Sequence, residues 1–593
     1  MNIRERISAL QKVMISKGID AYVITGADPH QSEITPQRWA VREWISGFTG
    51  SAGTVVVTRG KAGLWTDFRY YIQAENQLKN SGIALFKQGL PEVLEPAEWI
   101  KQELHSGACV SATAEELSAE QNKNYIQQFS AVDILFKTSE DLVDKVWINR
   151  PGVPVNFVKE IPETVCGKSR EEKIREVLTI ASKTHNAEYL MLSSLDDIAW
   201  VLNLRGSDVP HNPLFLSYLL LGKEKSVFFC DSKKLPDSIR ERLSNVVDVL
   251  PYSEIYKSIT KYIRKESRVF LSPEKTNMRL YQEIVSHAKP VEGRDITTDL
   301  KAIKNSVELD GMRRIHKQDG AAMVGFLSWF EKNAGSVVLN EVSAAEILLG
   351  YREKQKDFLG ESFSPIVAFG KNGALCHYSA VADTAAEITG HGLVVLDSGG
   401  QYNGGTTDIT RTLLLGEPTA QEIRDYTLVL KGHLAVSRQK FPVGTCGYQI
   451  DAFARKPLWD LGMNFGHGTG HGIGFMLNVH EGPQSISSKP INIPLKSGMI
   501  VSNEPGIYRE GKFGIRIENL LAVIPAKETE FGKFLCFEDI TRCPYDRILI
   551  DTKLLTTEEI EQIDNFHSLV FEDLSLELGE GEKEWLRNKT QPL

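Results

Sequence analysis

Four acidic residues in the second half of the chain lie in segments that otherwise have the pattern of apolar β-strands: Asp397, Asp408, Glu504 and Glu518. A lone carboxylate buried in such a strand is costly. Each pair of like charges about 4 Å apart costs about 4 kcal/mol at an effective dielectric constant near 20. Four carboxylates therefore share one cavity only if several are protonated or if cations are present.

Two divalent cations would balance these four carboxylates, with one neutral histidine as the nitrogen ligand. Oxygen-rich ligation with one imidazole and no thiolate is typical of catalytic sites for manganese, iron, cobalt or zinc, rather than of structural zinc. The alternative for the first two acids is turn chemistry, which aspartate favours. Residues 393–397 and 406–415 are expected to form a hairpin across the turn-rich stretch 398–405.

A glycine-rich segment accompanies the acids. Residues 466–474 alternate five glycines with His467 and His471, and His480 follows. The spacing matches neither a GxGxxG nor a Walker motif, so a phosphate cradle is disfavoured. Dense glycines let the backbone pass close to another group. A single histidine is more often structural than a ligand, but three of them beside these glycines indicate a site.

An internal repeat organises the first half of the chain. A Trp, six residues and a Ser, with Gly before the Ser, occur at residues 44–51 and again at 200–207, an offset of 156 residues. We interpret this as a tandem duplication of two α/β domains of about 140 residues each. They join near three prolines that hinder helical continuation, Pro151, Pro154 and Pro162.

A second boundary precedes a long helix. Asn305 and Glu308 form a capping-box pattern, after which apolar residues recur at helical spacing. Six of the 13 histidines follow in residues 363–525, and the composition of the acidic tail after about residue 555 predicts a solvated helical extension. We therefore expect three domains, at residues 1–150, 151–300 and 301–593.

Composition excludes several classes of partner. Lys and Arg number 68 against 77 Asp and Glu, a net charge of -9, so nucleic acid is not expected to bind. The longest apolar stretch, residues 214–221, is far below the roughly 20 residues that a bilayer demands and is expected to be a buried strand. The N-terminus lacks the apolar core of a secretory signal. Seven scattered cysteines without a CxxC pair favour reduced thiols, and we expect a cytoplasmic protein with no membrane contact.

The ordered set Asp397, Asp408, His471, Glu504 and Glu518 has spacings of 11, 63, 33 and 14 residues. This set resembles the dinuclear metal site of the pita-bread metallopeptidases, with all five ligand types in order. The resemblance implies a pita-bread catalytic domain behind the two α/β domains.

The resemblance covers nearly the whole chain. Residues 41–53, 65–70 and 203–209, and then the catalytic region, are similar to the three-domain aminopeptidase P family of cytosolic X-Pro aminopeptidases; Phe68 stands where that family has glycine. The implied fold class is α/β and α+β, with two tandem creatinase-like domains before the catalytic domain. The implied substrates are peptides with proline at the second position, and the implied assembly is a homodimer.

The resemblance also implies roles for the ligands. Asp408 and Glu518 would bridge two divalent metal ions, manganese first, with zinc, cobalt or iron as alternatives. Asp397 would chelate one ion, and His471 and Glu504 the other. A water or hydroxide would bridge the metals, and Glu504 would act as the general base that takes its proton. Paired metals lower the pKa of bound water toward about 7 and stabilise the oxyanion.

Further residues carry roles by the same resemblance. Three histidines would line the substrate pocket and steady the scissile carbonyl or the reaction intermediate: His377, His467 and His480. Tyr508 and Arg516 would support the site or contact the substrate, and Arg69 would reach the peptide from the first domain.

Four other functions remain open within the same fold. Prolidase would cleave X-Pro dipeptides, and methionine aminopeptidase would remove initiator methionine; both resemble one or two domains rather than three. A metal-free binding module, as in a histone-chaperone domain, or a creatinase-like amidinohydrolase would have broken ligands. All five ligands are intact here, so a metal-dependent enzyme is favoured.

Overall fold

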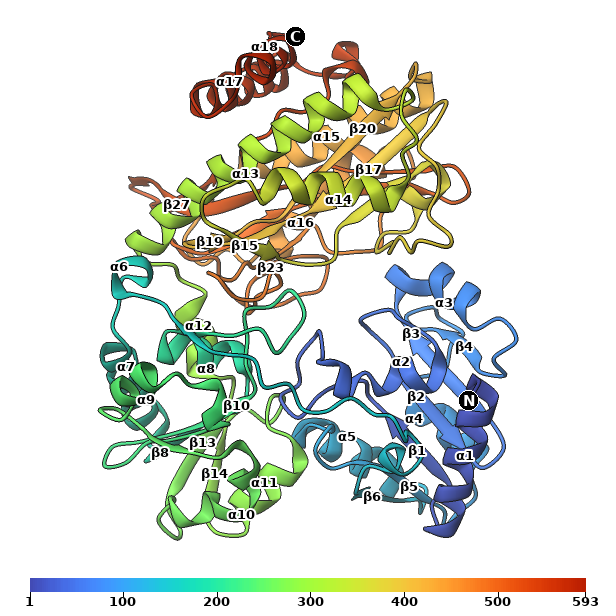
Figure 1. Ribbon diagram of the computed structural model, residues 1–593, viewed down its shortest axis with the longest axis vertical. Helices are drawn as coiled ribbons and strands as arrows, with labels where there is room; N and C mark the ends of the chain where they lie inside the picture. Colours follow the sequence, from blue (N-terminus) through green and yellow to red (C-terminus); the bar gives the residue numbers. More distant parts are fainter. The chain divides into compact units, whose positions relative to one another are not determined.

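The computed structural model describes all 593 residues, and the contacts within it divide the chain into two units. Unit 1 comprises Met1–Ile161 and Lys168–Thr298, and unit 2 comprises Pro162–Gly167 and Asp299–Leu593 (Figure 1). The three domain limits named above stay a prediction.

The first sheet of unit 1 has six strands in the order β4-β3-β2-β1-β5-β6. Strand β1 pairs antiparallel with β2 and parallel with β5. The strands are β1 (Ala21–Ile24), β2 (Thr54–Thr58), β3 (Ala62–Thr66), β4 (Ala84–Lys87), β5 (Cys109–Thr113) and β6 (Leu135–Ser139). The main helices are α1 (Ile3–Ser16), α2 (Val41–Ser46), α3 (Tyr71–Gln77), α4 (Pro96–Glu103) and α5 (Ala119–Ser130).

The second sheet of unit 1 repeats this arrangement in the order β12-β11-β10-β8-β13-β14. Here β8 pairs antiparallel with β10 and parallel with β13. The strands are β8 (Tyr189–Leu192), β10 (Ser217–Gly222), β11 (Val227–Cys230), β12 (Asp248–Leu250), β13 (Arg268–Leu271) and β14 (Lys289–Glu292). The main helices are α7 (Arg170–His185), α8 (Leu195–Leu202), α9 (Asp237–Leu243), α10 (Ile255–Ser258) and α11 (Met278–Val285).

The duplication inferred from the tryptophan spacing agrees with these topologies. The two sheets have the same strand order and the same alternation of parallel and antiparallel neighbours. Trp44 lies on α2 and Trp200 on α8, each on a helix that follows the first strand of its sheet. The apolar stretch at 214–221 contributes to the fully buried strand β10, as expected.

Unit 2 contains two sheets that matter for the site, β16-β17-β20 and β21-β28-β27-β24. Their strands are β16 (Ile366–Phe369), β17 (Gly392–Ser398), β20 (Ile409–Leu415), β21 (Lys440–Pro442), β24 (Ile500–Asn503), β27 (Asn519–Thr529) and β28 (Gly532–Asp539). Shorter strands are β15 (Phe358–Glu361), β18 (Gly400–Tyr402), β19 (Gly405–Thr406), β22 (Gly470–His471), β23 (Ser485–Ile486), β25 (Gly506–Arg509) and β26 (Phe513–Arg516). The main helices are α13 (Ser306–Asn333), α14 (Glu341–Arg352), α15 (Ala420–Ser437), α16 (Tyr448–Trp459), α17 (Thr557–Leu574) and α18 (Glu580–Lys589).

One pair of helices covers each of these sheets. Phe326 of α13 and Leu348 of α14 share a core with Leu396 of β17, and in Figure 1 both helices cross β17 and β20. Leu434 of α15 and Leu458 of α16 belong to a second core that contains residues of β24, β27 and β28. Each fully buried large apolar side chain contributes about 1.5–3 kcal/mol, so the two cores fix the sheets whose ends carry the acids. The expected capping box begins α13, where Asn305 accepts the N–H of Glu308.

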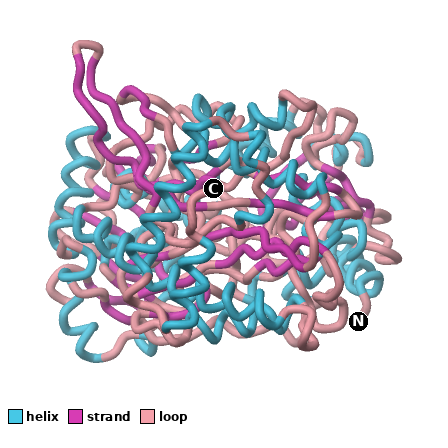
Figure 2. Tube along the Cα trace, turned by 90° about the horizontal axis from the view of Figure 1, so that it is seen from above, coloured by secondary structure: helices cyan, strands magenta, loops and turns pink.

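The C-terminal tail is helical, as expected, but it is not a solvated extension. Ile563, Val570 and Leu574 of α17 are fully buried in the larger core of unit 2. They lie 7 and 4 residues apart, so they form one apolar stripe that the acidic residues between them obscure in the sequence. The outer end of the β27–β28 hairpin is exposed instead, and it is the pair of strands that stands out in Figure 2.

Candidate metal centre

The sheet β16-β17-β20 positions two of the predicted ligands. Asp397 is the last residue but one of β17, and Asp408 immediately precedes β20. The expected hairpin between these segments exists, but its register places Thr410 opposite Asp397. Strands β18 and β19 occupy the connection, so Asp408 lies before the return strand instead of facing Asp397 across it. Both aspartates are buried.

The other two acids come from the second sheet. Glu504 directly follows β24, and its N–H donates to the carbonyl of Thr469 at 2.8 Å. Glu518 lies between β26 and β27, and its N–H donates to the carbonyl of Thr410 at 3.1 Å. The sequence pattern predicts one strand over residues 514–520, but the strand is interrupted after β26, and Glu518 lies in the interruption. This break lets the Glu518 backbone bond to β20, and so it joins the two sheets at the acids.

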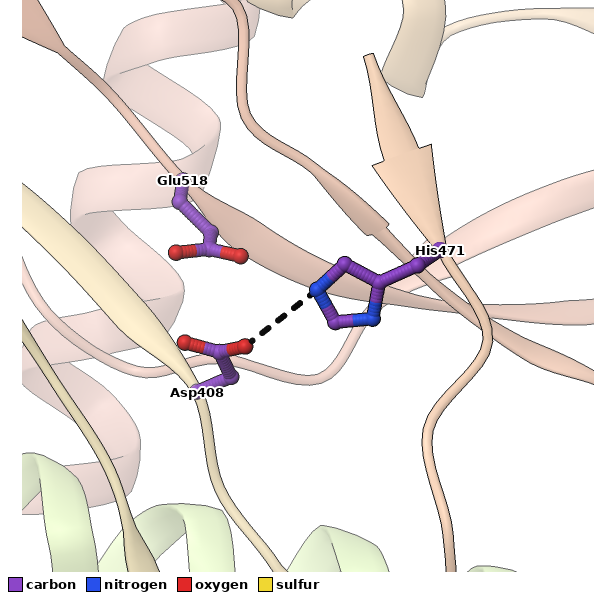
Figure 3. Close-up of side chains that lie close together, drawn as sticks. All are labelled: Asp408, His471 and Glu518. Atoms are coloured by element: carbon purple, nitrogen blue, oxygen red, sulfur yellow. Dashed lines mark ion pairs between the residues drawn. The ribbon is translucent and has the colours of Figure 1, made fainter. Parts of the chain in front are cut away.

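His471 completes the centre. Its Nδ1 bonds to the carbonyl of Gly472 at 2.9 Å, so Nε2 faces the carboxylates. This Nε2 lies 3.5 Å from Asp408 Oδ2 and 3.5 Å from Glu504 Oε1. Ligand atoms of Asp408, His471 and Glu518 all lie within 4.8 Å of one another (Figure 3). Because bonds from zinc to nitrogen or oxygen are about 2.0–2.2 Å long, these separations suit donors around a shared cation.

Unbalanced negative charge marks this centre. Burial raises the pKa of Glu518 well above its ordinary value, and the neighbouring charges of Asp408, Glu504 and Asp397 raise it further. Burial also raises the pKa of Glu504 and of Asp397. Asp397 Oδ1 and Glu518 Oε1 are buried without any hydrogen-bond partner. Buried polar atoms rarely lack partners, so the donor set fits divalent cations.

One cation of the protein reaches the acids directly. Arg516 Nη2 donates to Asp397 Oδ2 at 2.5 Å, and its Nη1 donates to the Tyr508 hydroxyl at 2.7 Å. The same hydroxyl lies 2.8 Å from His467 Nε2. These contacts link His467, Tyr508 and Arg516 to the predicted ligand Asp397 in a continuous chain; their roles toward the substrate stay a prediction.

Of the remaining predicted site residues, two histidines border the centre and Arg69 lies in the other unit. The His480 ring centroid lies 4.4 Å from that of His471, so His480 borders the centre. His377 follows the buried Cys376. Burial raises the pKa of the Cys376 thiol to about 12, and the nearby charge of Arg516 offsets part of this rise, so this loop also borders the centre. Arg69 belongs to unit 1, where Nε and Nη2 donate to the Asp67 carboxylate at 2.9 and 2.7 Å; its contact with a peptide stays a prediction.

Two hydroxyl groups that the sequence interpretation did not assign hold predicted ligands. Thr410 Oγ1 donates to Glu518 Oε2 at 2.8 Å. Ser502 Oγ donates to Glu504 Oε1 at 3.1 Å and accepts the His471 N–H at 2.9 Å. The only sequence signal for these hydroxyls is spacing: Thr410 lies two residues from Asp408, and Ser502 lies two residues from Glu504. In an extended strand, two side chains at this spacing lie on the same face.

Comparison with known proteins agrees with this description. Residues 310–525 match metallopeptidase family M24, and residues 533–593 match the C-terminal region of M24 peptidases. Residues 6–146 and 149–308 each match the creatinase/prolidase N-terminal domain. The fold and the centre therefore define a metallopeptidase with two creatinase-type domains before its catalytic domain.

Relatives that match over nearly the whole chain identify a more specific family within the metallopeptidases. The chain is 38% identical to a probable Xaa-Pro aminopeptidase P of Pyrenophora teres f. teres over 99% of this chain and 92% of that protein. It is 38% identical to aminopeptidase P2 of Arabidopsis thaliana, over 100% and 89% of the two chains. The crystal structure of an X-prolyl aminopeptidase from Caenorhabditis elegans, a cytosolic enzyme with a di-nuclear active site, is 32% identical and superposes with a TM-score of 0.95 over 100% of both chains.

The chain belongs to the Xaa-Pro aminopeptidase P family. The predicted family, fold class and enzyme class, a metal-dependent aminopeptidase, are thereby confirmed. No helix of the chain is both long and apolar enough to cross a membrane. None of the seven cysteines forms a disulfide.

Proposed function

We propose that this chain hydrolyses the bond between the N-terminal residue of a peptide and a following proline. The observation that carries the proposal is the cluster of Asp408, His471 and Glu518, whose ligand atoms lie within 4.8 Å of one another. This cluster occurs in a chain that matches an X-prolyl aminopeptidase over its full length.

We assign two divalent cations to the centre, held by the five predicted ligands: Asp397, Asp408, His471, Glu504 and Glu518. The ions supply positive charge that lowers the pKa of an attacking water and stabilises an oxyanion. Carboxylate oxygens with one imidazole suit manganese, with zinc, cobalt or iron as alternatives. The partnerless oxygens of Asp397 and Glu518 support this assignment.

Glu504 is proposed as the general base. Its Oε1 is held by the Ser502 hydroxyl at 3.1 Å and lies 3.5 Å from His471 Nε2. A carboxylate fixed at the centre accepts a proton from a water that is positioned there. Glu504 thus combines proton transfer with its role as a ligand.

Three histidines are proposed to stabilise the substrate and the reaction intermediate: His377, His467 and His480. A series of hydrogen bonds fixes the position of the His467 ring: it bonds to Tyr508, which bonds to Arg516, which in turn donates to Asp397. We assign Tyr508, Arg516 and Arg69 to substrate binding. A bond to proline is a tertiary amide without an N–H, so recognition depends on the ring and on the carbonyl.

The assembly is proposed to be a cytoplasmic homodimer. Three apolar side chains on and just after α16 are 44%, 48% and 53% exposed: Phe453, Trp459 and Leu461. A second copy that covers them would remove this apolar surface from water. Seven cysteines without a disulfide are consistent with a reducing compartment.

The experiment that tests the proposal compares three peptides after reconstitution with manganese. We expect release of the N-terminal residue from an X-Pro-X tripeptide, inhibition of that release by a chelator, and little cleavage of an X-Pro dipeptide or a Met-Ala peptide. Cleavage of the dipeptide alone would indicate a prolidase. No cleavage of any peptide, with metals bound, would contradict an enzymatic function.

A further inference from the structure

The glycine-rich loop of residues 465–474 has little intrinsic preference for one path. Five of its ten residues are glycine, which loses more conformational freedom on folding than any other residue. A Cβ added at Gly470 would lie 1.8 Å from the carbonyl oxygen of Ser502, and one at Gly472 would lie 2.0 Å from that of Glu481. The loop thus runs directly against other backbone segments, and contacts from outside must fix its path.

Arg455 of α16 supplies such contacts. Its Nη1 donates to the carbonyl of Phe465 at 2.6 Å and to Asn464 Oδ1 at 3.1 Å, and its Nη2 donates to the carbonyl of His467 at 2.8 Å. The other two N–H groups donate to Asp451, from Nε at 2.6 Å and from Nη2 at 3.1 Å. All five donors of the guanidinium are thereby used, on a residue that is only 3% exposed.

Asp451 extends the same contacts along the loop. Its Oδ1 accepts a hydrogen bond from Thr469 Oγ1 at 2.7 Å, and the Thr469 carbonyl accepts the N–H of Glu504 at 2.8 Å. His467, whose carbonyl is held by Arg455, bonds through Nε2 to Tyr508. One ion pair therefore holds two loop residues that contact the proposed catalytic groups: His467 through its backbone carbonyl and Thr469 through its hydroxyl.

We infer that Asp451 and Arg455, here called the α16 clamp, are positioning residues for the peptidase reaction. The clamp holds the loop backbone so that His467 reaches Tyr508 and Thr469 receives the N–H of Glu504. The inference rests on the proposed function, which gives His467 and Glu504 their roles. Stability alone does not account for the pair, because a buried ion pair is often replaceable by apolar residues without loss. Apolar side chains cannot donate to the loop carbonyls.

The first test is Arg455→Lys, which keeps the positive charge beside Asp451 but lacks the planar fork that reaches several acceptors. We expect kcat for an X-Pro-X tripeptide to fall about 10- to 100-fold, because small displacements of positioned groups have effects of this size. The metal content and KM are expected to change little.

Arg352→Lys is the matched control in the same unit. Arg352 is 1% exposed, and it donates to Asp319 from Nε at 2.8 Å and from Nη2 at 3.3 Å. It therefore repeats the buried Arg–Asp pair without donating to the loop. We expect this control to lower Tm by an amount similar to Arg455→Lys while kcat stays unchanged. Equal losses of kcat in the two variants would overturn the inference.

A double-mutant cycle shows whether the effect passes through the histidine. In a His467→Ala background, Arg455→Lys is expected to reduce kcat much less than it does in the wild-type chain, because coupled residues are not additive. The same fold-loss in both backgrounds would contradict positioning of His467 by the clamp.

Hydrogen exchange separates this inference from the proposed function. Backbone amides in peptides covering residues 465–474 are expected to exchange faster in Arg455→Lys than in Arg352→Lys, whether or not a substrate is cleaved. Unchanged exchange in this loop would overturn the clamp. Failure of the wild-type protein to cleave any X-Pro peptide would contradict the proposed function, and the exchange measurement would still decide the clamp.

Discussion

A buried carboxylate in unit 1 and those at the centre of unit 2 differ in how they are balanced. Asp208 in unit 1 accepts the N–H groups of Asn156 at 3.2 Å and Leu216 at 2.8 Å, and it pairs with the buried Lys234. In unit 2, Glu518 Oε1 has no partner, and Glu518 lies among other acids that raise its pKa.

This difference separates carboxylates that hold the fold from carboxylates that hold a ligand. A buried charge is tolerated when a counter-charge and hydrogen bonds satisfy it. Asp208 has both within the protein, so its role is complete in the folded chain. At the centre of unit 2 the balance is incomplete: Arg516 pairs with Asp397 Oδ2 and Thr410 donates to Glu518 Oε2, but Asp397 Oδ1 and Glu518 Oε1 have no partner. These two oxygens indicate the cations that the site needs.

The largest expected effect comes from removing a predicted bridging ligand. Asp408→Ala or Glu518→Ala is expected to lose metal and activity together. We expect at least about a 10³-fold fall in kcat/KM, equivalent to about 4 kcal/mol of barrier. Elemental analysis of purified protein and tripeptide hydrolysis measure the two losses.

His377→Ala is the control for this loss, because His377 lies outside the predicted ligand set. It is expected to lose activity while both metals remain bound. Retention of two metal ions by the Asp408→Ala variant would contradict the ligand assignment.

The sequence points to the acids and the histidine of the centre more directly than to the residues around them. Each acid ends or interrupts an apolar strand, so burial and charge conflict visibly, and the histidine lies among glycines. Thr410 and Ser502 carry no such conflict. Asp451 and Arg455 are four residues apart, a spacing that is common for exposed ion pairs on helices, and only the packing of α16 shows that they are buried.

The C-terminal tail is a second case in which the sequence does not show that a helix is buried. Its acidic composition favours a solvated helix, yet Ile563 and Val570 are buried in the core of unit 2. Helical periodicity describes one face of a segment, and it does not tell whether another element covers that face. Long-range packing therefore decides what local pattern leaves open.

Lys234→Met removes the counter-charge from the buried pair in unit 1. The variant leaves Asp208 buried and unpaired, so the free energy of unfolding is expected to fall by about 3–5 kcal/mol. Denaturant unfolding measures the loss, and the metal content is expected to stay unchanged. The double variant Asp208→Asn/Lys234→Met is expected to recover much of the stability; a double variant as unstable as the single one would show that packing, not charge, causes the loss.

Removing the metals is expected to make stability depend on pH. Burial raises the pKa values of Asp397, Glu504 and Glu518, so the folded metal-free protein binds protons that the unfolded chain has already released. Its free energy of unfolding therefore falls as the pH rises from the ordinary carboxyl range toward the raised values. Bound cations keep these groups ionised and abolish the effect. Tm measured from pH 5 to pH 8 with and without a chelator is expected to show a gap that widens with pH, and a constant gap would contradict the charge imbalance.

The smallest effect concerns a hydroxyl that orients a ligand. Thr410 Oγ1 donates to Glu518 Oε2 at 2.8 Å and accepts from Arg516 Nε at 3.3 Å. Thr410→Val keeps the shape of the side chain but removes both bonds, so metal affinity is expected to fall about 10-fold, the lower end for groups that orient metal ligands. Titration against a metal buffer measures this affinity. Thr410→Ser keeps the hydroxyl and is expected to bind metal almost as the wild type does; a serine variant as weak as the valine variant would show that the lost packing of the methyl group, rather than the hydrogen bond to Glu518, sets the affinity.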